Sequence, residues 1–246
     1  MNPVDGAHPN AQCWEPWPAR SNAQVTFFLG EQAAAQRIAR RIFHRSLAAW
    51  EYAGLVGAPD DTRVEIGTLD GHLYIEWGDP IAASYRAHYY VRRVGDRIIM
   101  TNDGIRIARN EMRHRGFGFR VFYRQINVAL ALGIDCIEVT AGRRDDENGY
   151  YTWPRFGFDG ALSMRVRCLL PESLKPARTL LDLMENEQGR AWWREYGETI
   201  VAQFSLAPGS RSLAIWERYA WMKTNLQNGP KRNLENQAAI AYCIAR

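Results

Sequence analysis

The stretch Met112–Arg120, with the sequence MRHRGFGFR, joins a run typical of a β-strand to a long amphipathic helix. Within it, Arg113, Gly116 and Gly118 spell R-x-x-G-x-G at the entrance to that helix. The first amides of a helix have no acceptor inside it, and the helix dipole places partial positive charge at the same end. Glycines let the backbone turn sharply and come close to the oxygens of a ligand. The stretch therefore predicts either a tight solvated turn or a socket for a phosphate-bearing ligand.

The residues on both sides of this stretch predict a strand, a helix and a second strand. The run GIRIA at 104–108 continues a strand, and a helix is expected from about Gly118 to Leu132, where Gly133 occupies the position of a helix-ending glycine. Its apolar stripe consists of Phe119, Phe122, Ile126, Ala129 and Leu130. The run IDCIEVTA at 134–141 is typical of a buried strand. This order predicts parallel pairing of the two strands with a right-handed crossover.

The chain before this stretch predicts an irregular arm, a helix and two hairpins. Residues 1–24 contain four prolines, and we expect them to be held by Trp14 and Trp17. A single helix is predicted from Glu31 up to Gly57, with Arg37, Arg40, Arg41 and Arg45 on its solvent side. Alternating runs around Asp70-Gly71 and around Gly95-Asp96 predict β-hairpins.

The chain after Pro171 is mostly helical in pattern, with two helical runs that flank the segment TIVAQFSLAPGS at 199–210. The sequence therefore predicts an α/β protein in three parts. These are an irregular arm at 1–24, a mixed α/β core at 25–170 and a helical extension at 171–246 that packs on the core.

Composition is that of an ordinary globular protein, since 46% of the 246 residues are hydrophobic and 24% are charged. A net charge of +4 permits an anionic ligand but does not demand nucleic acid. The cysteines show neither zinc-ligand spacing nor a disulfide framework, and the histidines show no metal-ligand spacing. We find no signal-peptide pattern and no apolar run near the ~20 residues of a membrane helix. A reduced, cytoplasmic protein with no membrane partner is the simplest expectation.

The glycine loop and its neighbours resemble the GNAT superfamily of acyl-CoA-dependent N-acyltransferases. That family has a [QR]-x-x-G-x-[GA] loop between its fourth strand and third helix, and RHRGFG at Arg113–Gly118 matches it. The helix that ends in ALG, the strand IDCIEV and a segment closing on Gly157-Phe158 follow in the family's order, so that the resemblance covers roughly residues 60–165. The run NGYYTWPRFGFDG looks like GNAT-like modules carried inside large bacterial and phage-associated proteins. The resemblance implies a mixed, mostly antiparallel central sheet flanked by helices.

The resemblance also implies acetyl-CoA, or another acyl-CoA, as cofactor and an amine as acceptor. The pyrophosphate of coenzyme A would bind the loop amides of His114–Gly118. Pantetheine would lie along the preceding strand edge, at about Ile107–Asn110, where two neighbouring strands splay apart. The cofactor-binding residues implied are Ile107, Ala108, Arg109, Arg113, His114, Arg115, Gly116, Phe117 and Gly118.

The catalytic residues are less clear from the resemblance. Many family members place a tyrosine four residues before the glycine of the Gly-Phe pair, as the acid that protonates the leaving thiolate. Here that position is Trp153, which cannot supply the proton. Tyr151 is the preferred substitute over Tyr150, although either ring can serve only for packing.

Glu138 and Glu111 are the candidate bases. Strand alternation places Glu138 on the same side as Cys136, and a carboxylate in so apolar a strand should have a partner or a raised pKa. A purely structural hydrogen-bonding role for Glu138 stays open.

Three functions remain as hypotheses. The first is an acyl-CoA-dependent N-acyltransferase that transfers acetyl to an amine by direct attack. The second, motivated by Trp153, is a catalytically inactive GNAT-like interaction module. The third, suggested by arginine-rich faces at 37–45 and 106–124, is an acyltransferase that acts on aminoacyl-tRNA.

Overall fold

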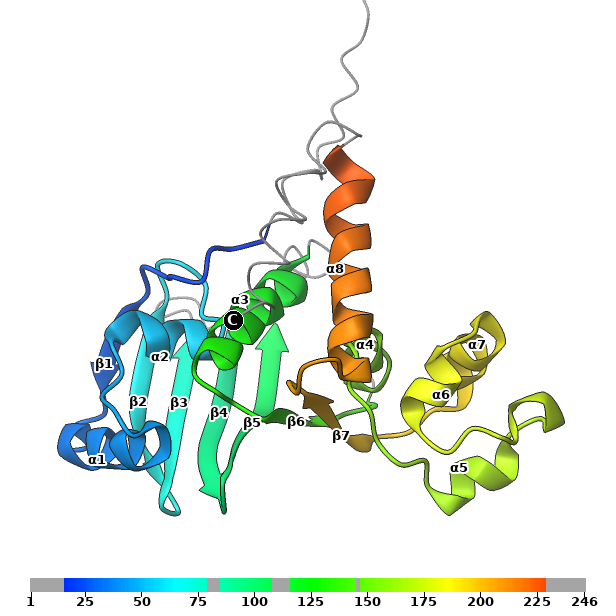
Figure 1. Cartoon of the computed structure of the whole chain (residues 1–246), viewed down its shortest axis with the longest axis horizontal. Coiled ribbons are helices and arrows are strands. Elements are labelled where there is room, and N and C mark those ends of the chain that lie inside the picture. Colours follow the sequence, from blue (N-terminus) through cyan, green and yellow to red (C-terminus); the bar gives the residue numbers. More distant parts are fainter. Residues whose placement is uncertain (1–15, 79–84, 108–115, 145–146, 229–246) are drawn as a thin grey trace, which may run out of the picture. The chain divides into compact units, whose positions relative to one another are not determined.

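A computed structural model of the chain describes residues 16–78, 85–107, 116–144 and 147–228. It shows an α/β fold with a mixed, seven-stranded sheet flanked by helices, and the strands lie in chain order from β1 to β7 (Figure 1). β1 and β2 are parallel, as are β5 and β6, whereas β2 and β3, and β6 and β7, are antiparallel. The α/β class and the parallel pairing of the strands around the glycine stretch are therefore confirmed.

The described residues form two compact units. Unit 1 contains the chain up to Tyr89, Ile105–Gly133 and the residues from Ala220 onward. Unit 2 contains Tyr90–Gly104 and Ile134–Tyr219. β4 and β5 contribute residues to both units. The boundaries at residues 24 and 170 stay predictions.

Unit 1 consists of strands whose side chains alternate between buried and more exposed positions, with helices packed against the strands. Its elements are β1 (Gln24–Phe27), α1 (Gln32–Phe43), α2 (Ala49–Leu55), β2 (Arg63–Leu69), β3 (His72–Gly78), the start of β4 (Tyr85–Val94), the end of β5 (Arg97–Ile107) and α3 (Phe117–Ala131). Buried side chains alternate along the strands and include Val64, Ile66, Leu73, Ile75 and Trp77. α1 contacts β2 and β3, and α2 contacts β1 and α3 (Figure 1).

The single helix predicted from Glu31 to Gly57 is wrong, because the structure has two. His44 adopts a left-handed conformation with φ 56°, which ends α1, and α2 begins at Ala49. The Glu51 carboxylate accepts hydrogen bonds from the backbone amide of Ala48 at 2.8 Å and from Arg45 at 2.5 Å. These bonds stabilise a new helix start that periodicity alone does not reveal.

The turns predicted from glycine dipeptides are confirmed. Asp70 and Gly71 both have positive φ, of 50° and 76°, as a two-residue hairpin turn requires. Gly95 has φ 59° between β4 and β5, and a connection this short can only join antiparallel strands. Gly133 follows α3 with φ 70°, so the predicted helix end is also correct.

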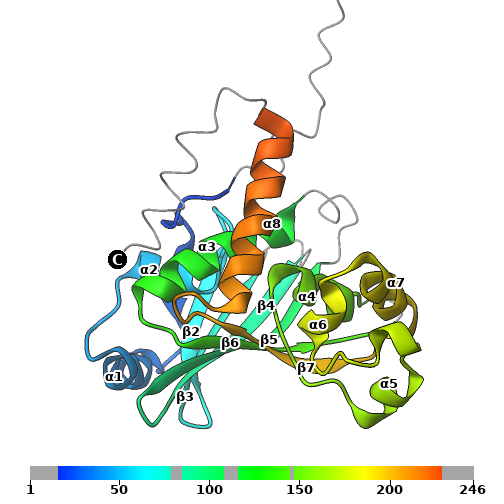
Figure 2. The same ribbon diagram turned by 45° about the vertical axis from the view of Figure 1, so that its right-hand side comes forward.

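Unit 2 contains β6 and β7 and most of the later helices. Its elements after β5 are β6 (Cys136–Ala141), α4 (Gly149–Phe156), α5 (Met164–Leu169), the 3₁₀ turn η2 (Glu172–Leu174), α6 (Leu180–Met184), α7 (Glu187–Tyr196), β7 (Ile200–Ser205) and the first half of α8 (Arg211–Asn228). Figure 2 shows α6 and α7 side by side, and the two helices are in contact.

The predicted helical extension at 171–246 also supplies a strand of the sheet. β7 pairs with β6 along its whole length, from Cys136↔Ser205 to Ala141↔Ile200. Ile200, Ala202 and Phe204 are buried and alternate with more exposed residues, the period of a strand with one covered face. Within the described ranges, no helix combines the length and apolar character needed to span a bilayer.

Candidate functional site

The glycine stretch ends in a helix start with an unusual backbone. α3 begins at Phe117, directly after Gly116, whose φ of 72° is one that glycine adopts without strain. A glycine in this position offers no side chain to cap the first amides of the helix. Apart from its chain neighbours and its own helix, no described residue has an atom within 4 Å of the place that a Cβ would take on Gly118.

Most of the predicted loop lies outside the described residues. These positions are Ala108, Arg109, Arg113, His114 and Arg115, together with the alternative base Glu111. Ile107 is the last residue of β5, and Gly116–Gly118 form the start of α3. The loop follows the fifth strand of the chain, whereas the family places it after its fourth strand, so the element count differs by one strand.

Phe117 is part of the core of unit 1. Its side chain is 3% exposed, and its ring lies 5.5–6.3 Å from the rings of Trp17, Trp77 and Tyr85. Only the backbone of Phe117 can therefore contact a cofactor, which agrees with a role through its amide.

The N-terminal arm is held on α3 by a buried arginine. Arg124 is 0% exposed and donates to the carbonyl oxygens of Pro18 and Ala58 and to the carboxylate of Asp60. Its guanidinium lies 5.0 Å from the ring centroid of Trp17. Burial lowers the pKa of Arg124 despite the nearby carboxylate. Trp17 thus holds the described part of the arm, residues 16–24, as predicted, whereas Trp14 lies outside the described residues. Arg124 is structural rather than part of an exposed basic face.

Pairing between the two parallel strands around the glycine stretch stops before either strand ends. β5 and β6 pair from Ile99↔Cys136 to Asn102↔Val139. β5 continues to Ile107 and β6 to Ala141, but no further pairs join the two strands. Pairing with β6 therefore stops five residues before the end of β5, the strand that leads into the glycine stretch.

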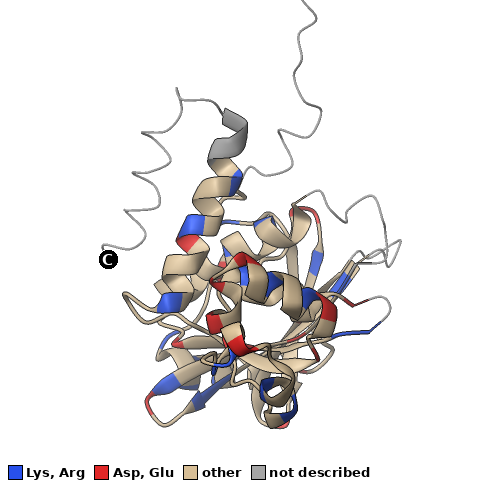
Figure 3. Ribbon diagram, turned by 90° about the vertical axis from the view of Figure 1, so that its right-hand side faces the viewer, with Lys and Arg blue, Asp and Glu red and all other residues tan. Residues whose placement is uncertain are grey.

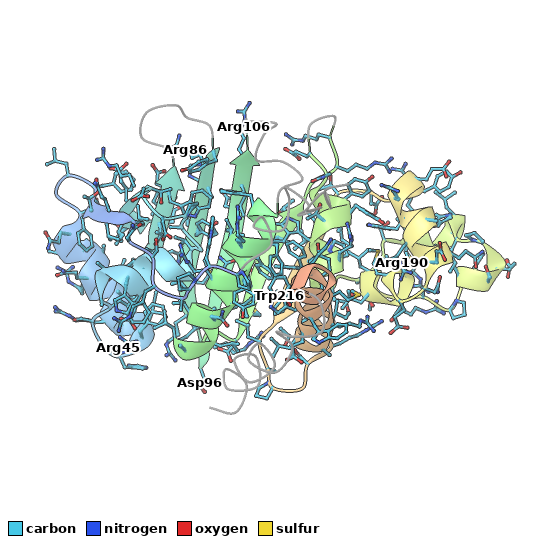
Figure 4. The ribbon with its side chains drawn as sticks, turned by 90° about the horizontal axis from the view of Figure 1, so that it is seen from above. Arg45, Arg86, Asp96, Arg106, Arg190 and Trp216 are labelled. Carbon is cyan, nitrogen blue, oxygen red and sulfur yellow. The ribbon has the colours of Figure 1, made fainter. Side chains whose placement is uncertain are left out.

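Two arginines lie at the end of the unit 1 sheet where β5 leads into the glycine stretch. Arg86, near the start of β4, and Arg106, near the end of β5, lie at the same end of neighbouring strands (Figure 4). Arg86 is paired with Glu76 at 2.9 Å. Arg106 is exposed and forms no ion pair with any described residue, so it adds positive potential one residue before the end of β5.

The predicted base Glu138 is a hydrogen-bonded link across four strands. Its Oε2 accepts from Arg92 of β4 at 2.6 Å and lies 3.4 Å from the Thr101 hydroxyl of β5, and its Oε1 accepts from Gln203 of β7 at 2.9 Å. It lies on the same side of β6 as Cys136, as alternation predicts. The expected partner of the carboxylate is therefore present, and both of its oxygens are in use.

The aromatic segment before Gly157 forms helix α4. Trp153 packs against Phe156 and Phe158, with ring centroids 6.0 Å and 5.0 Å away, so the residue at the family's tyrosine position is a packing residue. The Tyr150 hydroxyl donates to the carbonyl of Arg194 at 2.8 Å. The Tyr151 ring lies near two arginines, and its hydroxyl has no hydrogen bond to a described residue. Of the two tyrosines, only Tyr151 keeps its hydroxyl available for chemistry.

Sequence reasoning missed a second cluster of titratable groups, on the sheet of unit 1. The Tyr74 hydroxyl lies 2.6 Å from both Glu76 Oε2 and His88 Nδ1. Because a carboxylate can only accept, the hydroxyl donates to Glu76 and can accept from His88. Burial opposes ionisation of Glu76, but hydrogen bonds from Tyr74 and Arg86 outweigh it and lower its pKa. The spacing of residues 74 and 76 on one strand face is the only sequence signal for this cluster.

Comparison with known proteins adds no relative. No protein-family model matches the chain, and no curated protein matches it significantly.

Proposed function

We propose that the protein is an acyl-CoA-dependent N-acyltransferase that transfers acetyl from acetyl-CoA to an amine. The observation that carries the proposal is that β5 and β6 stop pairing after Asn102 and Val139, before β5 ends. Strand residues that have lost one neighbour keep peptide groups that an extended ligand can bind as an added strand does. The pantetheine arm of coenzyme A contains two amides, which can form hydrogen bonds with such peptide groups.

The start of α3 supports the proposal independently. β5 leads through residues 108–115 into a helix whose first residues are Gly116, Phe117 and Gly118. A helix start of this kind binds phosphate through its amides and its dipole. Arg106, exposed near the end of β5, supplies a fixed positive charge for the same pyrophosphate.

Acyl transfer in this proposal is a direct displacement. The amine nitrogen forms a bond to the thioester carbonyl carbon, and the bond from that carbon to sulfur breaks. Tyr151 is the candidate donor of a proton to the departing sulfur, and a base removes the proton that the amine nitrogen loses. Glu138 fits the role of base less well than it fits a structural role, since both oxygens accept from protein donors.

The test combines binding with turnover. Acetyl-CoA at about 100 times its Kd should add about 2.7 kcal/mol to the free energy of unfolding, which is roughly 5–10 °C in Tm for a chain of this length. Release of free thiol from acetyl-CoA across a panel of primary amines then measures turnover. The absence of any Tm shift at millimolar acetyl-CoA would contradict the proposal.

A non-catalytic interaction module is the second candidate function. It is favoured by the packing of Trp153 among phenylalanines and by the full engagement of Glu138. This candidate expects a Tm shift with acetyl-CoA but no release of thiol with any amine in the panel. Measured turnover eliminates it.

A further inference from the structure

Two arginines converge on one tyrosine ring in unit 2. Tyr151 and Arg155 are four residues apart on α4, a spacing that places them on the same helix face, and the Arg155 guanidinium lies 5.6 Å from the Tyr151 ring centroid. Arg194, in the last turn of α7, lies 5.3 Å from the same centroid. Two cations are therefore held against one phenol.

Two hydrogen bonds join α4 to α7 beneath this group. Trp193 is 0% exposed and its indole nitrogen donates to the carbonyl of Tyr150 at 2.8 Å. The Tyr150 hydroxyl donates in return to the carbonyl of Arg194 at 2.8 Å. These two bonds join the residue before Tyr151 to the end of α7, and neither of them uses the side chain of Arg155 or Arg194.

The three side chains keep their hydrogen-bonding capacity. Neither guanidinium, nor the Tyr151 hydroxyl, makes a hydrogen bond or ion pair with any residue that the structure describes. The neighbouring Arg143 behaves differently, because its guanidinium donates to the carbonyls of Glu195 and Gly197 at the end of α7. Both guanidiniums therefore keep their N–H donors for an anion that approaches this part of the surface.

We propose that Arg155 and Arg194, which both lie against the ring of Tyr151, bind the phosphomonoester group of a small molecule. Two guanidiniums match the −1.5 to −2 charge of such a group. Acidic and basic residues are nearly balanced over this unit and intermingle on its helices (Figure 3), which is not the continuous basic surface that nucleic acid requires.

The ligand we assign is the acceptor itself, a phosphorylated primary amine. This part rests on the proposed acyl transfer, because Tyr151 is also the candidate acid there. Binding of the phosphate is tested without acetyl-CoA, so the two proposals can fail separately.

The experiment uses three probes that share a primary amine: O-phosphoethanolamine, ethanolamine and β-alanine. Titration calorimetry and the side-chain Nε–H signals of arginine in NMR spectra report binding to the full chain. We expect saturable binding of O-phosphoethanolamine that weakens roughly tenfold or more in R155Q and in R194Q, since each removes one charged donor. Y151F should weaken it less. R165Q, at an exposed arginine of α5, is the matched control and should bind as the wild type does.

Each other outcome is decisive. No binding of O-phosphoethanolamine at millimolar concentration, or equal weakening in R165Q, overturns the site. Equal binding of β-alanine overturns the assignment of phosphate over carboxylate. Phosphate binding without any Tm shift by acetyl-CoA keeps the site and overturns the acceptor assignment. A Tm shift by acetyl-CoA without phosphate binding overturns the site alone.

Discussion

Replacement of Arg124 by methionine tests how α3 holds the N-terminal arm. The change removes donors to the carbonyls of Pro18 and Ala58 and to Asp60, and it removes the cation beside Trp17. Methionine fills much of the same volume, so the effect reports the guanidinium rather than a cavity.

The magnitude follows from what each partner loses. Ala58 is 0% exposed, so its carbonyl becomes a buried acceptor without a donor, at a cost of about 1–3 kcal/mol. The cation–π contact with Trp17 contributes roughly 0.5–2 kcal/mol. The Asp60 side chain is 44% exposed and water hydrates it, so its loss costs little. Relief from burying the guanidinium acts in the opposite direction, and we expect a net loss of about 2–4 kcal/mol.

The assay is urea unfolding followed by circular dichroism and tryptophan fluorescence, together with trypsin cleavage after Arg20. The loss corresponds to a fall in Tm of about 5–15 °C, and cleavage in the arm should accelerate because the arm detaches. Arg37→Met, at an exposed arginine of α1, is the matched control. A loss under 1 kcal/mol, or unchanged cleavage at Arg20, would refute the argument that Arg124 holds the arm.

Three further predictions concern the candidate site and unit 2. Glu138→Gln should lower the free energy of unfolding by about 1–2 kcal/mol, because the carboxylate accepts hydrogen bonds from Arg92 of β4 and Gln203 of β7. It should change the rate of acetyl transfer less than about threefold. A large fall in kcat with an intact fold would instead identify Glu138 as the base. The pKa of Asp182 falls from 3.8 to about 2, since hydrogen bonds from the Arg178 backbone and from Arg211 outweigh the effect of burial. Its stabilisation is complete above the unfolded pKa and is lost as pH falls from about 4 through about 2, so Asp182→Asn should cost about 1–2 kcal/mol in urea unfolding at pH 5 and nothing near pH 2. Gly118→Ala should raise Tm slightly, because the new Cβ meets no described side chain, but it should reduce the Tm shift caused by acetyl-CoA. Gly116→Ala should lower the free energy of unfolding by about 1 kcal/mol, because alanine is strained at a φ of 72°. If the acetyl-CoA shift is undiminished in Gly118→Ala, the glycine is not part of the cofactor site.

Local patterns predicted much of the secondary structure. The Asp70-Gly71 turn, the extent of α3, the strand from Cys136 and the alternation that sets Glu138 beside Cys136 are all visible in short windows of sequence. Each depends on backbone preferences or on a regular period, which act over a few residues. The break at His44 escaped detection because the residues on both sides fit one helical period.

The candidate site was less predictable, because its contacts join distant segments. Which strands and helices become neighbours decides two of these contacts. Glu138 accepts hydrogen bonds from Arg92 and Gln203, and Arg194 lies against the ring of Tyr151. Trp153 is a further example. Its identity alone excludes it as the general acid, but its role as a packing residue is visible only in its contact with Phe158.

The amino-acid sequence by itself determined the α/β class, the strand–helix–strand unit around Gly116 and the turns, because glycine conformation and the spacing of apolar residues act locally. Only the tertiary structure decided that β5 leaves β6 after Asn102, that β7 joins the sheet and that two arginines meet at Tyr151. Those features depend on which surfaces bury one another, and burial is a property of the whole chain rather than of any short segment.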